Sequence, residues 1–160
     1  MLPKIILPAG HDHDACAAKA LSQASNAATA NGVRLTPLRH YVLEMLLASH
    51  RPLGAYDVLA ALAREDSPAR PSPPTVYRAL DFLLEQGFIH RVASRNAFVA
   101  CFSPGKRHRA HLLICRACGQ VGEMADRNLE DALDDAAGRF RIEQEHVELH
   151  GLCEECADLA

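Results

Sequence analysis

Four cysteines in two Cys-x-x-Cys pairs are the residues of this chain best suited to bind a metal ion. The pairs are Cys115 with Cys118 and Cys153 with Cys156. Two residues between the cysteines let both sulfurs face one tetrahedral ion, so two such pairs predict a four-sulfur zinc site. Because four protein ligands leave no open position on the ion, this zinc would be structural. Two disulfides or four free thiols are the alternative interpretation, and the lack of an apolar leader segment argues against oxidation.

Composition indicates what these cysteines are attached to. The chain has 160 residues, 49% of them hydrophobic, and its formal net charge is −3. No apolar run is long enough to span a membrane, so we expect a soluble cytoplasmic protein. The charge is uneven: residues 33–109 carry eleven basic and six acidic side chains, whereas residues 110–160 carry four and twelve. A basic segment joined to an acidic one indicates that the first part meets a polyanion.

The basic segment has the pattern of a winged helix-turn-helix. Apolar residues recur at three- and four-residue steps in three stretches, which predicts three amphipathic helices. Thr36-Pro37 and Ser72-Pro73 are start signals for the first and third of these helices. The middle helix is expected over residues 55–65, and a Pro-rich turn over 67–71 follows it. Two short strands, 88–92 and 97–101, then predict the hairpin that forms the wing.

The flanking segments complete the expected architecture, an α+β fold with two domains. Residues 1–103 form the winged-helix domain, in which residues 1–32 are a loose N-terminal arm followed by a first helix. Residues 104–110 form a basic linker. Residues 111–160 form a small α/β domain that holds the cysteine pairs. Within it we expect strands on both sides of the first pair, a helix starting at Asp126, and a strand over 142–150. The side chains expected to point inward from that helix are Leu129, Leu133 and Ala136.

The chain resembles the ferric uptake regulator family over about residues 33–156. The resemblance is carried by several stretches in the family order: Arg34-Leu-Thr-Pro37, Ala55-Tyr-Asp57, Thr75 to His90, Phe98-Val-Ala-Cys101, His108, and Cys115 to Glu123. The zinc uptake regulators are the most similar branch. The resemblance implies a homodimeric, metal-activated DNA-binding repressor with a C-terminal dimerisation domain.

The DNA-reading element is expected at the start of the third helix of the helix-turn-helix. A recognition helix presents polar side chains to the major groove near its N-terminus. Arginine can donate two hydrogen bonds to guanine, so it is the strongest candidate for base recognition. The resemblance implies base contacts for the positions of Tyr56 and Arg78, and wing residues Arg91 and Arg95 are candidates for phosphate contacts. The predicted DNA-binding residues are Tyr56, Ser72, Thr75, Tyr77 and Arg78.

A second, regulatory zinc is expected on ligands that come from both domains. A sensor needs ligands on parts that must move together, because the ion can then favour one arrangement over another. With one thiolate, two imidazoles and one carboxylate, the candidate set suits zinc, whereas a set of only nitrogen and oxygen donors suits iron or manganese. The candidates, at positions that match the family, are His90, Cys101, His108 and Glu123. Three further histidines, His111, His146 and His150, are alternates or members of a third site.

These expectations combine into a zinc-responsive transcriptional repressor of zinc-homeostasis genes. It would bind a palindromic double-stranded DNA operator as a homodimer, with one structural and one regulatory zinc per chain. The alternatives are a sensor of iron, manganese or peroxide in the same family, and a zinc-ribbon module that binds only protein. An enzyme is not expected, because the His-Glu-x-x-His, deaminase, Walker and nucleophile-elbow patterns are all absent from the sequence.

Overall fold

The computed structural model describes residues 4–6, 12–64, 71–105 and 108–159. The chain divides into two compact units, one of residues 10–107 and the other of residues 1–9 together with 108–160. Within the described residues, no helix has the length and apolar character needed to cross a membrane. Parts of three expected features lie outside the described residues. They are residues 67–70 of the Pro-rich turn, Glu65 at the end of the middle helix, and positions 106 and 107 of the linker.

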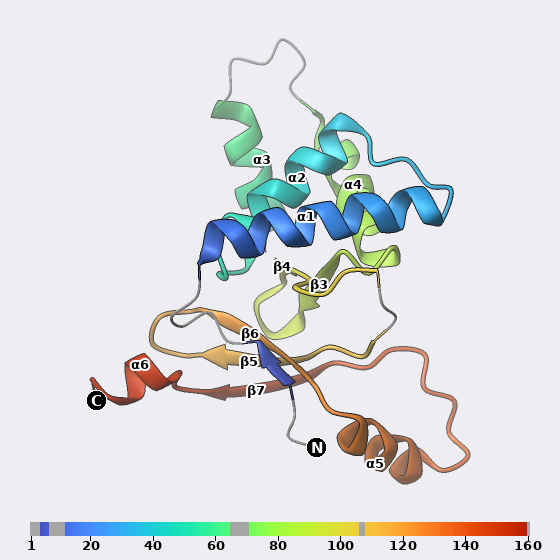
Figure 1. The fold of residues 1–160 in the computed structure, drawn as a ribbon, viewed down its shortest axis with the longest axis vertical. Helices are drawn as coiled ribbons and strands as arrows, with labels where there is room; N and C mark the ends of the chain where they lie inside the picture. Colours follow the sequence, from blue (N-terminus) through green and yellow to red (C-terminus); the bar gives the residue numbers. More distant parts are fainter. Residues whose placement is uncertain (1–3, 7–11, 65–70, 106–107, 160) are drawn as a thin grey trace. The chain divides into compact units, whose positions relative to one another are not determined.

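The described part of residues 10–107 contains four helices, and side-chain caps mark the starts of the first two (Figure 1). The side chain of Asp12 accepts a hydrogen bond from the amide of Ala15, which satisfies one of the unpaired amides at the start of the first helix. Thr36 does the same for the amide of Arg39, and Pro37 is the first residue of the second helix. The helices are α1 (His13–Ala30), α2 (Pro37–Leu47), α3 (Ala55–Arg64) and α4 (Pro73–Glu85).

The core of this unit forms where the apolar faces of the helices meet. Three alanines of α1, at a spacing of four residues, are completely or almost completely buried, so this helix lies close to α2. The other helices contribute branched aliphatic side chains at three- and four-residue steps, as their sequences predict. Arg39 of α2 places its guanidinium 3.5 Å from the centre of the Phe82 ring of α4 and so links these two helices. The core-forming residues include Ala20, Ala24, Ala28, Val42, Leu46, Val58, Val76, Leu80 and Leu83.

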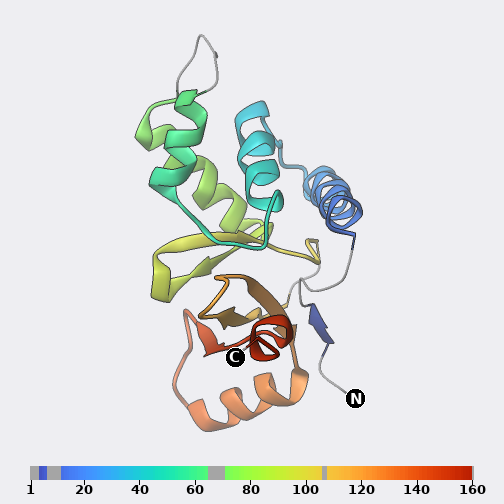
Figure 2. The same cartoon turned by 90° about the vertical axis from the view of Figure 1, so that its left-hand side faces the viewer.

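A three-stranded sheet completes the winged helix-turn-helix, and its hairpin follows α4 directly (Figure 2). Its strands, in the order β2-β4-β3, are β2 (Leu53–Gly54), β3 (Ile89–Val92) and β4 (Ala97–Ala100). The predicted hairpin is therefore confirmed, and the two-residue strand β2 is an addition to it. The turn between β3 and β4 is a short 3₁₀ segment that ends at Asn96, which has a φ of 47°. Asparagine tolerates this left-handed conformation better than most residues.

The other unit is a four-stranded sheet with two helices. Its strand order is β1-β6-β5-β7. β5 and β6 are antiparallel and are joined by the first cysteine pair, whereas β7 runs parallel to β5. The strands are β1 (Lys4–Ile6), β5 (His111–Cys115), β6 (Val121–Ala125) and β7 (Val147–Gly151), and the helices are α5 (Arg127–Ala137) and α6 (Glu154–Ala157). Asp126 caps α5, as predicted, by accepting hydrogen bonds from two amides.

Three sequence expectations about this unit are wrong. The N-terminal arm was expected to be irregular, but residues 4–6 pair with β6 as an edge strand. The last strand was expected from residue 142, but it begins at Val147 because His111, the first residue of β5, is its partner there. Residues 142–146 therefore have no neighbouring strand in β5. Ala136 was expected to point inward, but it is exposed, whereas Leu129 and Leu133 are half-buried.

Candidate metal centres and nucleic-acid interface

The four cysteines of the two pairs come together at one end of the sheet. Cys115 ends β5, and Cys118 lies in the turn before β6, where Gly119 adopts a φ of 78°. Cys153 and Cys156 lie at the start and within the short helix α6 that follows β7. The parallel pairing of β5 with β7 ends at Cys115 and Gly151, which places the second pair beside the first. The four sulfur atoms all lie within 4.8 Å of one another.

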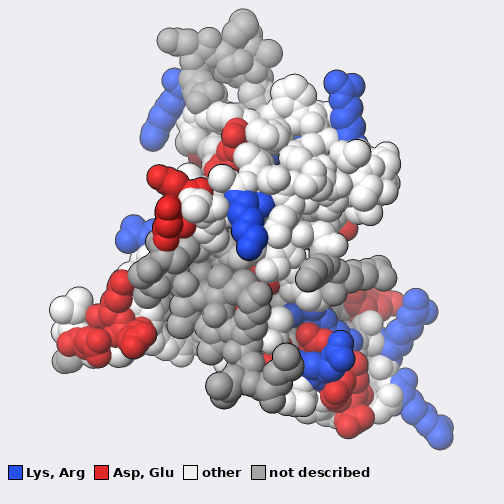
Figure 3. All heavy atoms as spheres, viewed as in Figure 1, with Lys and Arg blue, Asp and Glu red and all other residues white. Residues whose placement is uncertain are grey.

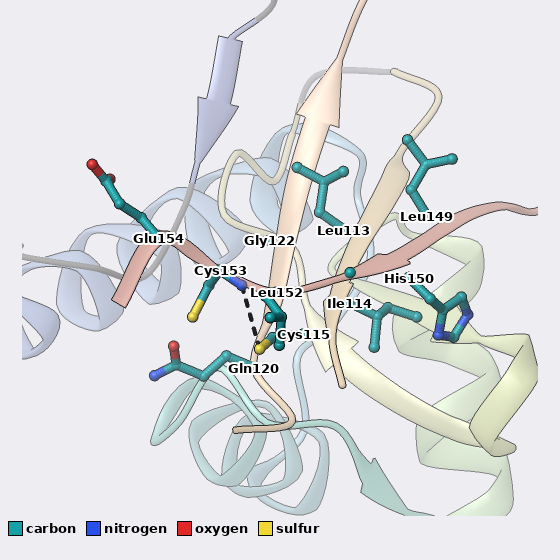
Figure 4. A pocket seen from close by; sticks show the side chains of 11 residues that line it. Leu113, Ile114, Cys115, Gln120, Gly122, Leu149, His150, Leu152, Cys153 and Glu154 are labelled. Carbon is teal, nitrogen blue, oxygen red and sulfur yellow. Dashed lines mark hydrogen bonds between the residues drawn. The ribbon is translucent and has the colours of Figure 1, made fainter. Parts of the chain in front are cut away.

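The distances and hydrogen bonds of this cluster fit a tetrahedral zinc ion. Zinc–sulfur bonds of about 2.3 Å in a tetrahedron place the sulfurs about 3.8 Å apart. The sulfurs of Cys118 and Cys153 are 3.8 Å apart, and all six cysteines of the chain are free thiols. The amide of Cys153 donates a hydrogen bond to the sulfur of Cys115 over 3.4 Å, the dashed line in Figure 4. Amide donors of this kind stabilise a thiolate.

The protonation of the thiols shows why the cluster needs a cation. Amide hydrogen bonds from Cys118 and Cys153 lower the pKa of Cys115 to about 5, so this residue is a thiolate at neutral pH. A hydrogen bond with the Cys153 thiol, burial, and the nearby Cys115 thiolate raise the pKa of Cys156 to about 12. With Cys115 a thiolate and the pKa of Cys156 raised, the metal-free cluster favours a mixture of thiolates and thiols. A bound divalent ion would supply the positive charge that allows four thiolates to share the site.

His90 and Cys101 occupy one face of the β3–β4 hairpin in the helical unit. His90 pairs with Val99 across the hairpin, and Cys101 follows two residues after Val99. Side chains two residues apart on a strand point to the same face, so those of His90 and Cys101 are diagonal neighbours there. Cys101 is 1% exposed, and its amide donates to the carbonyl oxygen of Phe88 over 2.9 Å. The hairpin therefore presents one imidazole and one thiol as a ligand pair.

His108 and Glu123 form a second ligand pair within the sheet unit. The carboxylate of Glu123, on β6, is hydrogen-bonded to Nε2 of His108. The side chain of Glu123 is only 4% exposed and that of His108 only 16%. A buried carboxylate is costly unless it has a cationic or hydrogen-bonding partner, and this histidine provides one. Glu123 also lies in the middle of its strand, with β1 on one side and β5 on the other, so its backbone is held on both edges.

The neighbouring residue Arg109, which sequence reasoning assigned only to a basic linker, is anchored to the sheet unit. Its guanidinium lies 2.8 Å from Oδ1 of Asp134 on α5 and 3.5 Å from Oε2 of Glu145. The hydrogen bond with Asp134 raises the pKa of Arg109. No local sequence signal identifies this contact, because its partners lie 25 and 36 residues further along the chain. His108 and Arg109 therefore belong to the sheet unit and not to the linker.

The three alternate histidines have other surroundings. His111 is buried, and its Nδ1 lies 3.8 Å from a carboxylate oxygen of Glu145. His150 lies 3.6 Å from Glu148, and Figure 4 shows it beside the pocket next to the cysteine cluster. None of His111, His146 and His150 belongs to a group of three or more metal-ligating side chains in the part of the chain that the structure describes.

The candidate DNA-reading residues lie on the exposed faces of α3 and α4. The buried face of α4 is formed by Val76, Ala79, Leu80 and Leu83, which leaves Thr75, Tyr77 and Arg78 on its outer face. Tyr56, the second residue of α3, is 80% exposed. Its ring is therefore accessible to a binding partner. The side-chain oxygens of Ser72 and Thr75, also exposed, lie 2.9 Å apart at the start of α4.

Basic side chains do not form one continuous patch on the face shown in Figure 3. In the wing, Arg91 donates a hydrogen bond to the side chain of Asn96 over 3.0 Å. This arginine therefore supports the turn between β3 and β4 as well as being a candidate for phosphate contact. Acidic residues occur in the sheet unit, including Glu154 and Glu155 in the first turn of α6.

Comparison with known proteins gives one consistent family. The pattern of the ferric uptake regulator family matches residues 30–152. The zinc uptake regulation protein of Escherichia coli strain K12 is 39% identical over 142 residues, which are 87% of this chain and 82% of that protein. A solved structure of a zinc uptake regulator complexed with zinc and DNA is 39% identical, has a TM-score of 0.77, and covers 89% of this chain and 96% of that chain.

A second solved structure agrees. Holo XcZur is 36% identical, has a TM-score of 0.75, and covers 92% of this chain and 99% of that chain. The family pattern spans the helix-turn-helix, the wing, the first cysteine pair and strands β5, β6 and β7, and it ends at the residue before Cys153. The chain belongs to the ferric uptake regulator family.

Proposed function

We propose that this protein is a zinc-responsive DNA-binding repressor of zinc-homeostasis genes, acting in the cytoplasm. The observation that carries the proposal is the distribution of ligand side chains over the two compact units. The wing hairpin carries one pair, His90 and Cys101, and the sheet unit carries another, His108 and Glu123. Each pair alone has too few ligands to hold a zinc ion firmly, because zinc prefers four.

One regulatory zinc ion shared by the two pairs would make DNA binding depend on zinc. An ion bound by all four side chains restricts the winged helix relative to the sheet unit, whereas the metal-free chain keeps more freedom. Zinc then favours the arrangements in which all four side chains meet, and DNA favours those that fit its groove. The binding of zinc and the binding of DNA are therefore coupled. The single thiolate of Cys101 makes zinc the preferred ion over iron or manganese.

The four-cysteine site has a different role in this proposal. Its zinc ion is structural, because all four positions are filled by protein sulfurs and the site joins the ends of β5 and β7. The protein thus holds one structural and one regulatory zinc ion per chain. Stoichiometry tests this directly: mild chelation is expected to remove one ion of two per chain and leave the sheet folded. A single class of ion, released in one step with the sheet, would contradict the proposal.

We also propose that the sheet unit forms a homodimer. Support comes from apolar side chains that one chain leaves uncovered: Phe140 is 79% exposed and Leu149 on β7 is 50% exposed. Leu149 lines a pocket with Leu113, Ile114 and Leu152 beside the cysteine cluster (Figure 4). Contiguous exposed apolar surface marks interaction sites, and these side chains are candidates for such a surface. A dimer would give two recognition helices for two half-sites of a palindromic operator.

The dimer predicts a change in mass when Leu149 becomes charged. Leu149→Asp is expected to shift the protein from dimer to monomer, because an aspartate would be buried without a partner in the interface. Light scattering coupled to gel filtration measures this, with the zinc content as the check on folding. Asp131→Ala, an exposed position on α5, is the matched control and is expected to leave the mass unchanged. If the wild-type protein has the mass of a monomer at all concentrations, the proposed dimer is wrong.

The function is tested by DNA binding at buffered free zinc concentrations. A gel-shift titration against promoter fragments of zinc-uptake genes is expected to show binding with zinc and its loss when zinc is buffered away. Iron and manganese at the same free concentrations serve as controls. Binding that follows iron, manganese or peroxide would identify another kind of sensor in the same family. No specific DNA binding under any of these conditions would favour a protein-interaction module instead.

Arg78→Ala is expected to abolish sequence preference while leaving zinc content and folding unchanged. Its guanidinium lies on the outer face of α4, and an arginine that reads guanine contributes about 1–3 kcal/mol of discrimination, which is roughly 5- to 150-fold. Competition between operator and unrelated DNA measures the loss. Arg78→Lys, which keeps the charge but lacks the planar guanidinium, is expected to recover only part of the preference. Arg127→Ala, an exposed arginine on α5, is the matched control, and preference retained by Arg78→Ala would refute the role.

A further inference from the structure

The N-terminal strand β1 is the feature that neither the family pattern nor the proposed DNA contacts explain. It precedes residue 30, where the family pattern begins, and it pairs antiparallel with β6. The register places Ile6 opposite Glu123, the proposed regulatory ligand. Without β1, β6 would be an edge strand, with β5 as its only neighbour in the described sheet. β1 therefore adds a second hydrogen-bonded strand at the position of this ligand.

Strand β1 also changes how the chain connects the two compact units. Residues 1–9 belong to the sheet unit, residues 10–107 to the helical unit, and residues 108–160 to the sheet unit again. The chain therefore passes between the units twice, once after β1 and once after the wing. Five residues separate Ile6 from Asp12, the cap of α1. Fully extended, this span reaches at most about 22 Å.

Both ends of this first connection are held. On one side, the backbone of residues 4–6 is paired with β6. On the other, the first residue of α1 is tied into the helical unit, because Nδ1 of His13 lies 3.1 Å from Nε2 of His50. His50 is 5% exposed, and its ring lies 4.6 Å from the ring of Phe102, just beyond the wing. The described residues on both sides of this connection are thus anchored.

We propose that β1 and the segment that follows it act as a second tether between the units and thereby raise the affinity of the regulatory zinc site. The inference rests on the proposed function, since it takes the regulatory ligands to be His90 and Cys101 on one unit and His108 and Glu123 on the other. A zinc ion that joins the two pairs must bring them together, which costs conformational entropy. A second short connection excludes many arrangements in which the pairs are far apart, so less entropy is lost when zinc binds.

Lengthening the tether without disturbing β1 tests this directly. Insertion of ten Gly/Ser residues between Ala9 and Gly10 leaves the sequence of β1 and α1 intact. Effective concentration falls as about the −3/2 power of tether length, so ten residues are expected to weaken regulatory zinc binding by up to about fourfold and twenty by up to about ninefold. Competition with a chromogenic zinc chelator measures this affinity without DNA. The same ten residues added after Ala160 are the matched control, with equal mass and an unchanged tether.

Three measurements separate the tether from other roles of β1. Hydrogen exchange of the β6 amides is expected to stay slow in the insertion variants, since β1 remains paired. Small-angle X-ray scattering of protein freed of exchangeable zinc is expected to show a larger radius of gyration for the internal insertion than for the C-terminal one. DNA affinity at saturating zinc is expected to change by less than about twofold, because the fully liganded protein is already joined by the ion.

The outcomes are distinct. A graded loss of zinc affinity with insert length supports the tether. Unchanged affinity and radius of gyration after insertion, combined with weakening only when residues 2–9 are deleted, would overturn it and assign β1 to covering the sheet edge. Tighter zinc binding after insertion would also overturn it, since the tether would then oppose the bound state. Failure of the proposed function appears elsewhere, as a wild-type protein without zinc-dependent DNA binding, and the scattering comparison still decides the tether in that case.

Discussion

Replacement of Cys115 by serine is expected to remove zinc from the four-cysteine site and to unfold the sheet unit. Cys115 is buried at the end of β5, and its sulfur accepts the amide hydrogen bond of Cys153 at the start of α6. Binding of structural zinc is worth on the order of 10–16 kcal/mol in small zinc peptides, and a whole domain is stable by only about 5–15 kcal/mol. A site reduced to three sulfurs therefore cannot keep this unit folded.

The effect is measured by zinc content and hydrogen exchange. Loss of protection is expected in β5, β6 and β7, whereas helices α1 to α4 keep theirs, because their core contains no residue of the sheet unit. Cys16→Ser is the matched control, since Cys16 is a half-buried thiol on α1 outside both ligand sets. A Cys115→Ser protein that keeps its zinc and its protected sheet would show that the fold does not depend on this site.

Cys101→Ser is expected to weaken the zinc response strongly while leaving the structural zinc and the fold in place. The hydroxyl of serine is a poor zinc ligand compared with a thiolate, so the regulatory site would keep three of its four proposed ligands. Cys101 is 1% exposed, and serine has a similar size, so the wing should still pack. In a gel-shift assay at buffered zinc, we expect the zinc concentration for half-maximal binding to rise at least about tenfold, as for a lost ligand interaction of about 1.4 kcal/mol or more.

Two further measurements distinguish a loss of zinc sensing from a loss of folding stability in Cys101→Ser. The number of chelation-resistant zinc ions per chain should remain one, and thermal unfolding should change little. Glu123→Gln is a second variant at the opposite unit, and it should raise the zinc requirement in the same direction because it removes the charge of the buried carboxylate. Cys16→Ser again serves as the control. If Cys101→Ser gains DNA affinity at the wild-type zinc concentration, Cys101 is not a regulatory ligand.

Features that depend on neighbouring residues were predictable from the sequence. Thr36-Pro37 and Asp126 mark helix starts through hydrogen bonds that reach only two or three residues along the chain, and the structure places helices there. The spacing within each cysteine pair is local in the same sense. That both pairs meet is a consequence of β5 and β7 running in parallel, which the sequence pattern does not specify.

Features that depend on distant partners were not predictable. Residues 4–6 contain two isoleucines, which favour strands, but the flanking Pro3 and Pro8 argue against regular structure. The strand forms through its pairing with β6, a distant part of the chain. Residues 142–146 alternate like a strand, yet β5 begins too late to pair with them. His108 and Glu123 are fifteen residues apart, with β5 between them in the sequence. Only the family resemblance pointed to these two positions. That they bind zinc is still a proposal.

The parallel pairing of β5 with β7 also determines how quickly this unit is able to form. The two strands are adjacent in the sheet but are separated by β6, α5 and the segment before β7. Contacts between residues so far apart in sequence make folding slow, because a long loop must close before any of them is gained. Zinc bound first by one cysteine pair would capture the other and close this loop ahead of the sheet. Nascent chains made when zinc is scarce would therefore spend longer unfolded, and the abundance of the repressor would itself follow zinc supply.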